Sequence, residues 1–209
     1  MTTNRLALPT RLPHAGEIRT GEQVATKTGR TRPSRLEHFR LTGPEFTLRA
    51  AADIYGGEPR PWDDAPTAGA WELYTQTDTL HVAVILDDPD VLDSGHWEHW
   101  SGGGRLRRCD GQTCEHTVVT GTGDNTKAET RLVPCMCDPE NPECKPTTRL
   151  RVVLPLIPGL GTWRLVTHSI YAAMEIPGVI EFLRLQGARG TIEAYLRIQN
   201  REVKRPGQP

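Results

Sequence analysis

All five cysteines of this 209-residue chain lie in one window of the sequence. Thiolates are the soft ligands that zinc takes in tetrahedral structural sites, and short loops supply them with little backbone strain. The segment from Pro134 to Cys144 reads Pro-Cys-Met-Cys-Asp-Pro-Glu-Asn-Pro-Glu-Cys, which is rich in turn formers and poor in apolar residues. Such a segment is typical of a metal-binding loop. We therefore predict a structural Zn²⁺ ion, with the preferred ligands Cys109, Cys135, Cys137 and Cys144.

The choice of the fourth ligand stays open at this point. Cys114 could replace Cys109, and His116 is a further candidate. The Cys-x-Cys spacing at Cys135 and Cys137 is also tighter than the usual two-residue spacer of zinc sites. The alternative is a group of reduced surface thiols, since thiols stay reduced in the cytosol.

A catalytic zinc is a weaker hypothesis. It would need an open coordination position and a nearby general base, and Glu115 or His116 could be assigned that role. The His-x-Glu and Pro-Cys-x-x-Cys signature of zinc deaminases is absent, however, because only Met136 separates Cys135 from Cys137. We expect no enzymatic activity and keep a zinc hydrolase or deaminase as the lesser alternative.

Composition limits the partners. The 25 basic and 26 acidic residues nearly cancel, so no global charge favours wrapping nucleic acid or docking on an anionic membrane. No apolar run approaches the roughly 20 residues that cross a bilayer, and the start lacks a signal peptide pattern. We expect a cytoplasmic protein. Its hydrophobic fraction of 36% allows only a modest core, which makes an additional metal staple useful.

The elements that would position the cysteines are mostly strands. Residues 71–77 alternate apolar and polar side chains, and residues 80–86 are predicted to be their antiparallel partner. Further strands are predicted at 35–42, 148–155, 161–168 and 191–198. No repeating β-α-β pattern appears. The prediction is an α+β fold with a mainly antiparallel sheet, a few short helices and an inserted cysteine-rich zinc loop region over about residues 105–147.

Three short helices are predicted from the spacing of apolar residues. The first covers residues 48–55 and ends at Gly56-Gly57. The second covers residues 91–100 and ends at the glycines 102–104. The third covers residues 171–185, where Pro177 is expected to kink or divide the helix.

The domain organisation follows from the distribution of apolar residues. Residues 1–34 are polar, rich in Thr, Arg, Gly and Pro, and show no periodicity, so they predict a flexible basic N-terminal tail. Residues 35–203 are expected to form a single α+β domain. Residues 204–209 are expected to be a polar C-terminal tail.

Several blocks, in this order, resemble one known family. They begin at Leu36 (LEHFRLT), Tyr55 (YGGEPRPW), Trp71 (WELYTQT), Trp100 (WSGGG), Arg108 (RCDG), Pro134 (PCMC), Cys144 (CKPTTRL) and Gly159 (GLGTWRLVTH). Together they look like the recombination directionality factor-like proteins of actinobacterial phages and prophages. The resemblance covers roughly residues 35–205.

The resemblance implies a protein without catalysis that binds a large serine integrase on DNA. Such a factor switches the integrase from integration to excision through contacts with its zinc-ribbon and coiled-coil region, and little direct DNA binding is expected. The metal assignment carries over to Cys109, Cys135, Cys137 and Cys144. The alternative is a zinc-stapled phage or host adaptor, or a single-stranded nucleic-acid-binding protein.

Partner contacts are expected to use exposed apolar residues and arginines. Trp62, which is flanked by prolines and lies near Arg60, is the leading candidate anchor. A tryptophan in the core is the alternative for this residue.

Overall fold

The computed structural model describes residues 13–26, 29, 31–101, 104–121, 126–138, 143–157, 159 and 161–200. The chain divides into two compact units rather than the single domain expected over residues 35–203. Unit 1 contains Met1–Val84, Val152–Arg164 and Glu193–Pro209, and unit 2 contains Ile85–Arg151 and Leu165–Ile192. The two units arise because the chain leaves unit 1 after Val84, builds most of unit 2 and then returns. The predicted tail at residues 204–209 lies outside the described residues.

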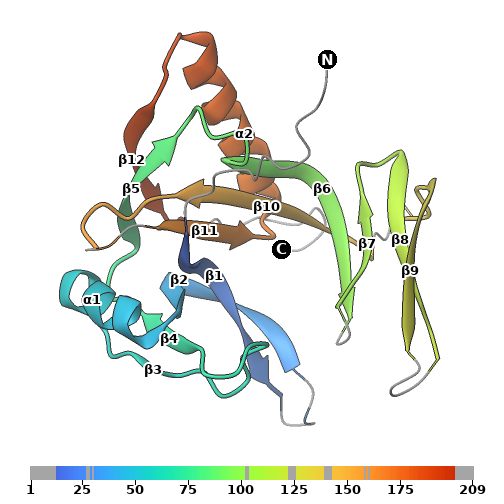
Figure 1. Cartoon of the computed structure of the whole chain (residues 1–209), viewed down its shortest axis with the longest axis horizontal. Helices are drawn as coiled ribbons and strands as arrows, with labels where there is room; N and C mark the ends of the chain where they lie inside the picture. Colours follow the sequence, from blue (N-terminus) through green and yellow to red (C-terminus); the bar gives the residue numbers. More distant parts are fainter. Residues whose placement is uncertain are drawn as a thin grey trace, which may run out of the picture. The chain divides into compact units, whose positions relative to one another are not determined.

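Unit 1 contains one helix and a sheet in which β1 pairs with β2, β2 with β4 and β3 with β4, all antiparallel (Figure 1). Its strands run in the order β3-β4-β2-β1-β11, and β5 pairs separately with β12. The bounds are β1 His14–Ala25, β2 Thr31–Gly43, α1 Glu45–Tyr55, β3 Arg60–Pro61, β4 Trp71–Tyr74, β5 Thr79–Ile85, β11 Thr162–Thr167 and β12 Thr191–Arg197. The boundary of the unit falls inside three of these strands, so Ile85 of β5, β11 from Leu165 on and the first two residues of β12 belong to unit 2.

Helix α1 confirms the first predicted helix. Leu48, Ala51 and Tyr55 are buried at helical spacing, and the helix packs against β4. Glu45 in the first turn forms an exposed ion pair with Arg49 four residues later. The helix ends at Gly56, whose φ of 71° lies in the left-handed region that glycine adopts without strain.

The prediction of a tail over residues 1–34 is wrong for its second half, because β1 and the start of β2 fall there. Residues 1–12 lie outside the described residues. In β1 the buried face consists of Gly16 and Ile18, so the strand offers only one large apolar side chain to a pattern search. A Cβ atom at Gly16 would lie 2.5 Å from the carbonyl oxygen of Thr42 and 2.7 Å from the ring of Trp163. The buried face of β1 is therefore held by close packing around Gly16, and the strand lacks the alternation of apolar side chains that predicts a strand.

Unit 2 contains the cysteine region. Its strands run in the order β10-β6-β7-β8-β9, and each neighbouring pair is antiparallel (Figure 1). The bounds are β6 Leu92–Ser101, β7 Gly104–Cys109, β8 Thr113–Thr120, β9 Lys127–Pro134, β10 Lys145–Val152 and α2 Ile170–Leu185. Its buried apolar side chains include Leu86, Val91, Leu150, Leu165 and Ile180.

The helix predicted over residues 91–100 is wrong, because this segment is strand β6. Two neighbouring strands hold it in extended form, since Trp97 lies opposite Cys109 of β7 and opposite Pro146 of β10. Pairing on both sides satisfies the backbone groups that a helix would bond internally. Gly104 accordingly starts β7 rather than ending a helix.

Two further expectations about elements are corrected. Strand β5 pairs with β12, while β4 lies between β2 and β3, so residues 80–86 are not the partner of residues 71–77. Helix α2 runs without interruption over Ile170–Leu185, so Pro177 does not divide it. A proline inside a helix removes one backbone hydrogen bond and crowds the carbonyl four residues before it, so the expected kink stays a prediction.

The fold class is confirmed: the structure is mainly antiparallel sheet with two helices and a cysteine cluster among its described residues. Neither of these helices is long and apolar enough to cross a membrane.

Candidate metal centre

The turn between β7 and β8 places the first cysteine. Cys109 ends β7, and the Asp110 carboxylate accepts hydrogen bonds from the backbone N–H groups of Gln112 (2.9 Å) and Thr113 (2.7 Å). Gly111 lies in this turn with a φ of 95°. The carbonyl oxygen of Gln112 then accepts a hydrogen bond from the backbone N–H of Cys135 at 2.8 Å. This bond fixes the end of β9 beside the β7–β8 turn.

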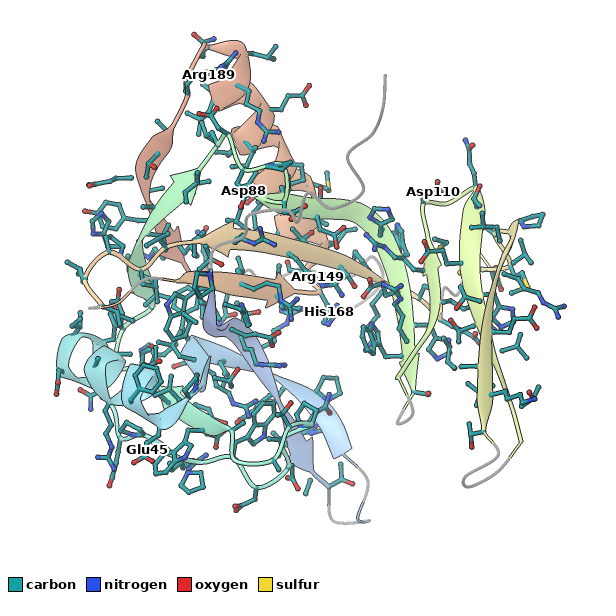
Figure 2. All side chains as sticks on the ribbon, viewed as in Figure 1. Glu45, Asp88, Asp110, Arg149, His168 and Arg189 are labelled. Atoms are coloured by element: carbon teal, nitrogen blue, oxygen red, sulfur yellow. The ribbon has the colours of Figure 1, made fainter. Side chains whose placement is uncertain are left out.

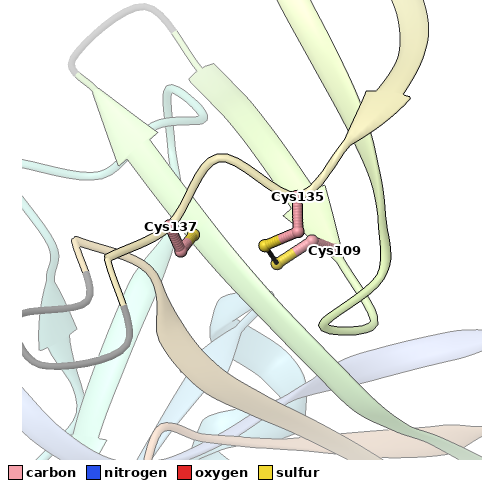
Figure 3. A group of neighbouring side chains, drawn as sticks. All are labelled: Cys109, Cys135 and Cys137. Carbon is pink, nitrogen blue, oxygen red and sulfur yellow. Dashed lines mark hydrogen bonds between the residues drawn. The ribbon is translucent and has the colours of Figure 1, made fainter.

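Three thiols gather where these segments meet. The Sγ atoms of Cys109, Cys135 and Cys137 all lie within 4.8 Å of one another (Figure 3). The distance between the Sγ atoms of Cys109 and Cys135 is 3.9 Å. A zinc ion with Zn–S bonds of about 2.3 Å in a tetrahedron separates its sulfur atoms by roughly 3.8 Å. The observed spacing fits a metal ion held by thiolates.

Cys144 approaches the same group from the start of β10. Its Sγ atom lies 3.2 Å from that of Cys137, and its side chain is buried. Cys144 is not one of the three thiols that lie mutually within 4.8 Å, but it packs in the same cluster as the other three preferred ligands.

The alternative ligands lie nearby but in different positions. Cys114 is buried opposite Cys109 in the β7–β8 ladder and packs in the same cluster, together with Trp97 and Val133. It is not one of the three thiols that are mutually within 4.8 Å. His116 lies two residues farther along β8, opposite Arg107 of β7, and is likewise outside that group.

Burial sets the protonation of these thiols when no metal is bound. It raises the pKa of Cys109 to about 11, and burial together with the neighbouring Cys137 thiol raises the pKa of Cys144 to about 12. The pKa of Cys135 is lowered instead, chiefly by a hydrogen bond from the backbone of Cys137. A bound cation reverses this preference, because a coordinating thiol is deprotonated outright. Binding of a metal ion by Cys109 and Cys144 would therefore release their protons.

Glu98 of β6 is surrounded by arginines from β7 and β10. It follows Trp97, which lies opposite Cys109 in the sheet. The Glu98 side chain is fully buried and accepts hydrogen bonds from Arg149 at 2.6 and 3.0 Å and from Trp100 at 2.9 Å (Figure 2 labels Arg149). Arg105 and Arg108 form longer ion pairs with the same carboxylate, at 3.5 and 3.9 Å. Burial alone would raise the pKa of Glu98, but these partners lower it to about 2.

The sequence alone does not identify this network. Glu98 lies in a segment that was assigned to a helix, and Arg149 is 51 residues away in the chain. The available signal is the row of arginines at 105, 107 and 108, close in the sequence to the acidic residues Asp93 and Glu98. Only the antiparallel register places Glu98 opposite Arg108.

The predicted partner contacts Arg60 and Trp62 lie in unit 1. The guanidinium groups of Arg19 and Arg40 lie over the Trp62 ring, 5.1 and 4.5 Å from its centroid. Arg60 donates a hydrogen bond of 2.7 Å to Glu72, and Glu72 also accepts one from Arg40. Trp62 is thus half-buried under two arginines of its own chain. A partner-binding role for Arg60 and Trp62 stays a prediction.

Comparison with known proteins gives one finding. No curated protein and no solved structure matches the chain. A family model described as recombination directionality factor-like, and named Gp3-like, matches residues 15–209. This match reaches into both units and includes every cysteine and all of β1 but its first residue. The chain belongs to the recombination directionality factor-like family.

Proposed function

We propose that the chain is a recombination directionality factor that binds a large serine integrase on DNA and switches it from integration to excision. The observation that carries the proposal is membership of the family over residues 15–209. In this proposal the protein has no catalytic activity. In this proposal Cys109, Cys135, Cys137 and Cys144 hold a structural Zn²⁺ ion. The three thiols that lie within 4.8 Å of one another support this set, and Cys144 lies beside Cys137.

The surroundings of the cysteines support an architectural metal. A catalytic zinc needs an open coordination position and a base that can reach it. Four thiolate ligands would complete the tetrahedron. Glu115, the acidic residue next to Cys114 in the chain, forms an ion pair of 3.2 Å with Arg105. These features favour a metal that stabilises the fold over one that activates water.

The charge distribution favours a protein partner over DNA alone. The formal net charge is −1. In unit 1 the arginines grouped around Trp62 are paired with carboxylates: Arg19 with Glu17, and Arg40 with Glu72. Non-specific DNA binding depends on basic side chains that can release counterions from phosphates. The paired arginines supply little of this free charge.

The mechanism requires only differential binding. A factor that binds one arrangement of the integrase more tightly than another shifts the population toward the first, without taking part in the chemistry. Shifting an equilibrium from 1:99 to 99:1 takes about 5.5 kcal/mol of differential affinity. A protein interface of ordinary size can supply this free energy.

The test is a recombination assay with the purified chain and the serine integrase encoded by the same genome. We expect excision between the two hybrid attachment sites only when the chain is present. The integrase acting alone on its normal integration sites is the control for integrase activity. Excision that is unchanged by the chain, with an integrase active in the control, would refute the proposal.

A salt titration separates the proposal from the nucleic-acid-binding alternative. A directionality factor should co-elute with the integrase and bind naked DNA weakly. A single-stranded nucleic-acid-binding protein would instead bind DNA or RNA alone, with an affinity that falls steeply as salt rises.

A further inference from the structure

The thiols of Cys137 and Cys144 lie closer together than a shared zinc ion requires. Their Sγ atoms are 3.2 Å apart, whereas two sulfur atoms on one tetrahedral zinc ion are separated by roughly 3.8 Å. The other close pair, Cys109 and Cys135, has a spacing of 3.9 Å, which agrees with the zinc value. A disulfide bond is about 2.05 Å long. The spacing of Cys137 and Cys144 thus lies between that of two zinc ligands and that of a disulfide.

The two thiols of this pair differ in their access to solvent. Cys137 is half-buried, so a small molecule in solution can reach its sulfur atom. Cys144 is only 2% exposed, which closes its sulfur atom to solvent. Cysteines that respond to oxidants combine these two features, because an accessible thiol reacts first and a neighbouring thiol resolves the product. Cys137 is therefore suited to the first role and Cys144 to the second.

The chain between these two cysteines is short. They are seven residues apart, and the intervening sequence Asp-Pro-Glu-Asn-Pro-Glu contains two prolines. The entropy cost of joining two points of a chain is smaller for a short loop than for a long one. Proline lowers this cost further, because its φ is already fixed. Closing a bond between Cys137 and Cys144 would therefore order little additional chain.

Two other pairs of thiols are less suited to form a bond. Cys109 and Cys135 are 3.9 Å apart, so they would have to move farther than the closer pair. Cys114 lies opposite Cys109 in the β7–β8 ladder, but it is outside the group of mutually close thiols. Both of these residues are also buried, so neither offers an accessible sulfur atom to an oxidant. The geometry singles out one pair among the five cysteines.

We propose that Cys137 and Cys144 are a modification site, where a peroxide converts the two thiols into a reversible disulfide. In the first step the Cys137 sulfur attacks an oxygen atom of hydrogen peroxide and the O–O bond breaks. The leaving hydroxide takes the thiol proton as water, and Cys137 becomes a sulfenic acid. In the second step the Cys144 sulfur attacks the sulfenic sulfur, and the hydroxyl group leaves with the Cys144 proton as a second water. The two sulfur atoms lose two electrons, which the peroxide gains.

This disulfide and a zinc ion exclude each other. The thiolate is the form of cysteine that binds metal, and a disulfide sulfur carries no such charge. Oxidation therefore removes two of the four proposed ligands, Cys137 and Cys144, and releases the ion. A thiol reductant reopens the disulfide by exchange, after which zinc can bind again. The release of zinc rests on the proposed ligand set, whereas formation of the disulfide requires neither zinc nor the integrase.

The test treats the purified full chain with hydrogen peroxide and has two readouts, the disulfide and the released zinc. The disulfide is mapped by mass spectrometry after digestion, without reductant, by a protease that cleaves after glutamate. Cleavage at Glu140 and Glu143 falls between the two cysteines, so only a disulfide keeps their peptides together. Fragmentation at Met136 then distinguishes Cys137 from Cys135. We expect the free thiols to fall from five to about three per chain, with about one zinc ion released per disulfide.

Two matched variants locate the bond. Cys144→Ser removes the resolving thiol, whereas Cys114→Ser removes an equally buried thiol outside the close group. We expect Cys144→Ser to lose the linkage and Cys114→Ser to keep it, and the wild-type map decides the pairing by itself if a variant does not fold. The inference is overturned if the dominant linkage joins another pair, or if no linkage forms with or without prior treatment by a chelator. A chain that forms the linkage but holds no zinc would support the pair and refute the proposed ligand set.

Discussion

At the scale of single residues, the thiols of Cys137 and Cys114 have opposite expected roles, although both lie near Cys109. Cys137 belongs to the group of mutually close thiols and also lies 3.2 Å from Cys144. Cys114 and Cys144 are both buried thiols outside that group, and Cys144 is distinguished by its contact with Cys137. A thiol is polarisable and packs as a small hydrophobic side chain, so burial alone accounts for Cys114.

We therefore expect Cys137→Ser to lose bound zinc and Cys114→Ser to keep it. Elemental analysis of the purified wild-type chain should find roughly one zinc ion per chain, as for a single tetrahedral site. The same measurement on Cys137→Ser should find almost none. Loss of zinc from Cys114→Ser, with retention in Cys137→Ser, would show that Cys114 is the ligand and would correct the proposed set.

Glu98 gives a residue-scale prediction about acid stability. Its pKa is about 2 in the folded protein and about 4.5 in the unfolded chain. Because the folded value is the lower one, the carboxylate stabilises the fold fully above about pH 4.5. This stabilisation, on the order of 3 kcal/mol, is lost as the pH falls toward 2.

We expect Glu98→Gln to lower the free energy of unfolding at pH 7 by several kcal/mol, because three arginines lose their buried partner. The gap between wild type and variant should shrink on acidification toward pH 2. Urea denaturation at a series of pH values measures it. Glu129→Gln, in an exposed pair with Arg131, is the control and should change stability little. A gap that stays constant with pH would contradict the assignment.

At the scale of elements, two glycines beside or within the helices should respond oppositely to alanine. Gly57, just after α1, has a φ of 93°, and a Cβ atom there would lie 2.1 Å from the carbonyl oxygen of Tyr74. Gly178, inside α2, has open space around it. We expect Gly57→Ala to destabilise the fold by about 1–3 kcal/mol. Gly178→Ala should stabilise it by up to about 1 kcal/mol. Thermal unfolding of both variants checks the two signs.

The local sequence pattern predicted those elements whose type does not depend on which strands pair with them. Strands β5, β10, β11 and β12 and helices α1 and α2 all appear where alternation or helical spacing indicated them. Strand β6 was mistaken for a helix because two histidines and two tryptophans recur three residues apart, and its extended form depends on β7 and β10. The pairing of β5 with β12 joins segments more than 100 residues apart, which no local pattern encodes.

For the candidate metal site, likewise, the residues could be predicted from the sequence but their arrangement could not. The cysteines could be identified from the sequence because residue type alone limits what five clustered thiols do. Their arrangement could not, since it depends on the hydrogen bond from the Cys135 backbone to Gln112 across the β7–β8 turn. The exposed apolar side chains of α2 are not predicted either, because helical periodicity does not reveal which face of a helix is buried.

At the scale of the whole molecule, all the proposed zinc ligands belong to unit 2. Every described residue of β9 except Val133 is exposed, so few apolar contacts hold this strand in place. A metal that links Cys109 of β7 to the segment after β9 would supply the missing constraint. Metal removal should therefore loosen unit 2 much more than unit 1.

Hydrogen exchange with and without a chelator measures this difference. We expect faster exchange in β7, β8 and β9 after chelation, and unchanged exchange in α1 and β2 of unit 1. Addition of zinc to the chelated protein should restore the slow exchange. Equal loss of protection in both units would mean that the metal supports the entire fold rather than the cysteine region.

The last prediction concerns the complex with the integrase. If one bound state accounts for the switch, the chain should suppress integration and promote excision over the same range of concentration. Linkage requires this. A factor that binds one integrase arrangement more tightly raises the population of that arrangement and lowers the population of the other by the same amount. Recombination assays on both pairs of sites, across a titration of the chain, give two half-maximal concentrations. We expect them to agree within about a factor of three, which is under 1 kcal/mol in binding free energy, because both report one equilibrium. Values more than about tenfold apart, or about 1.4 kcal/mol in binding free energy, would imply two separate binding events.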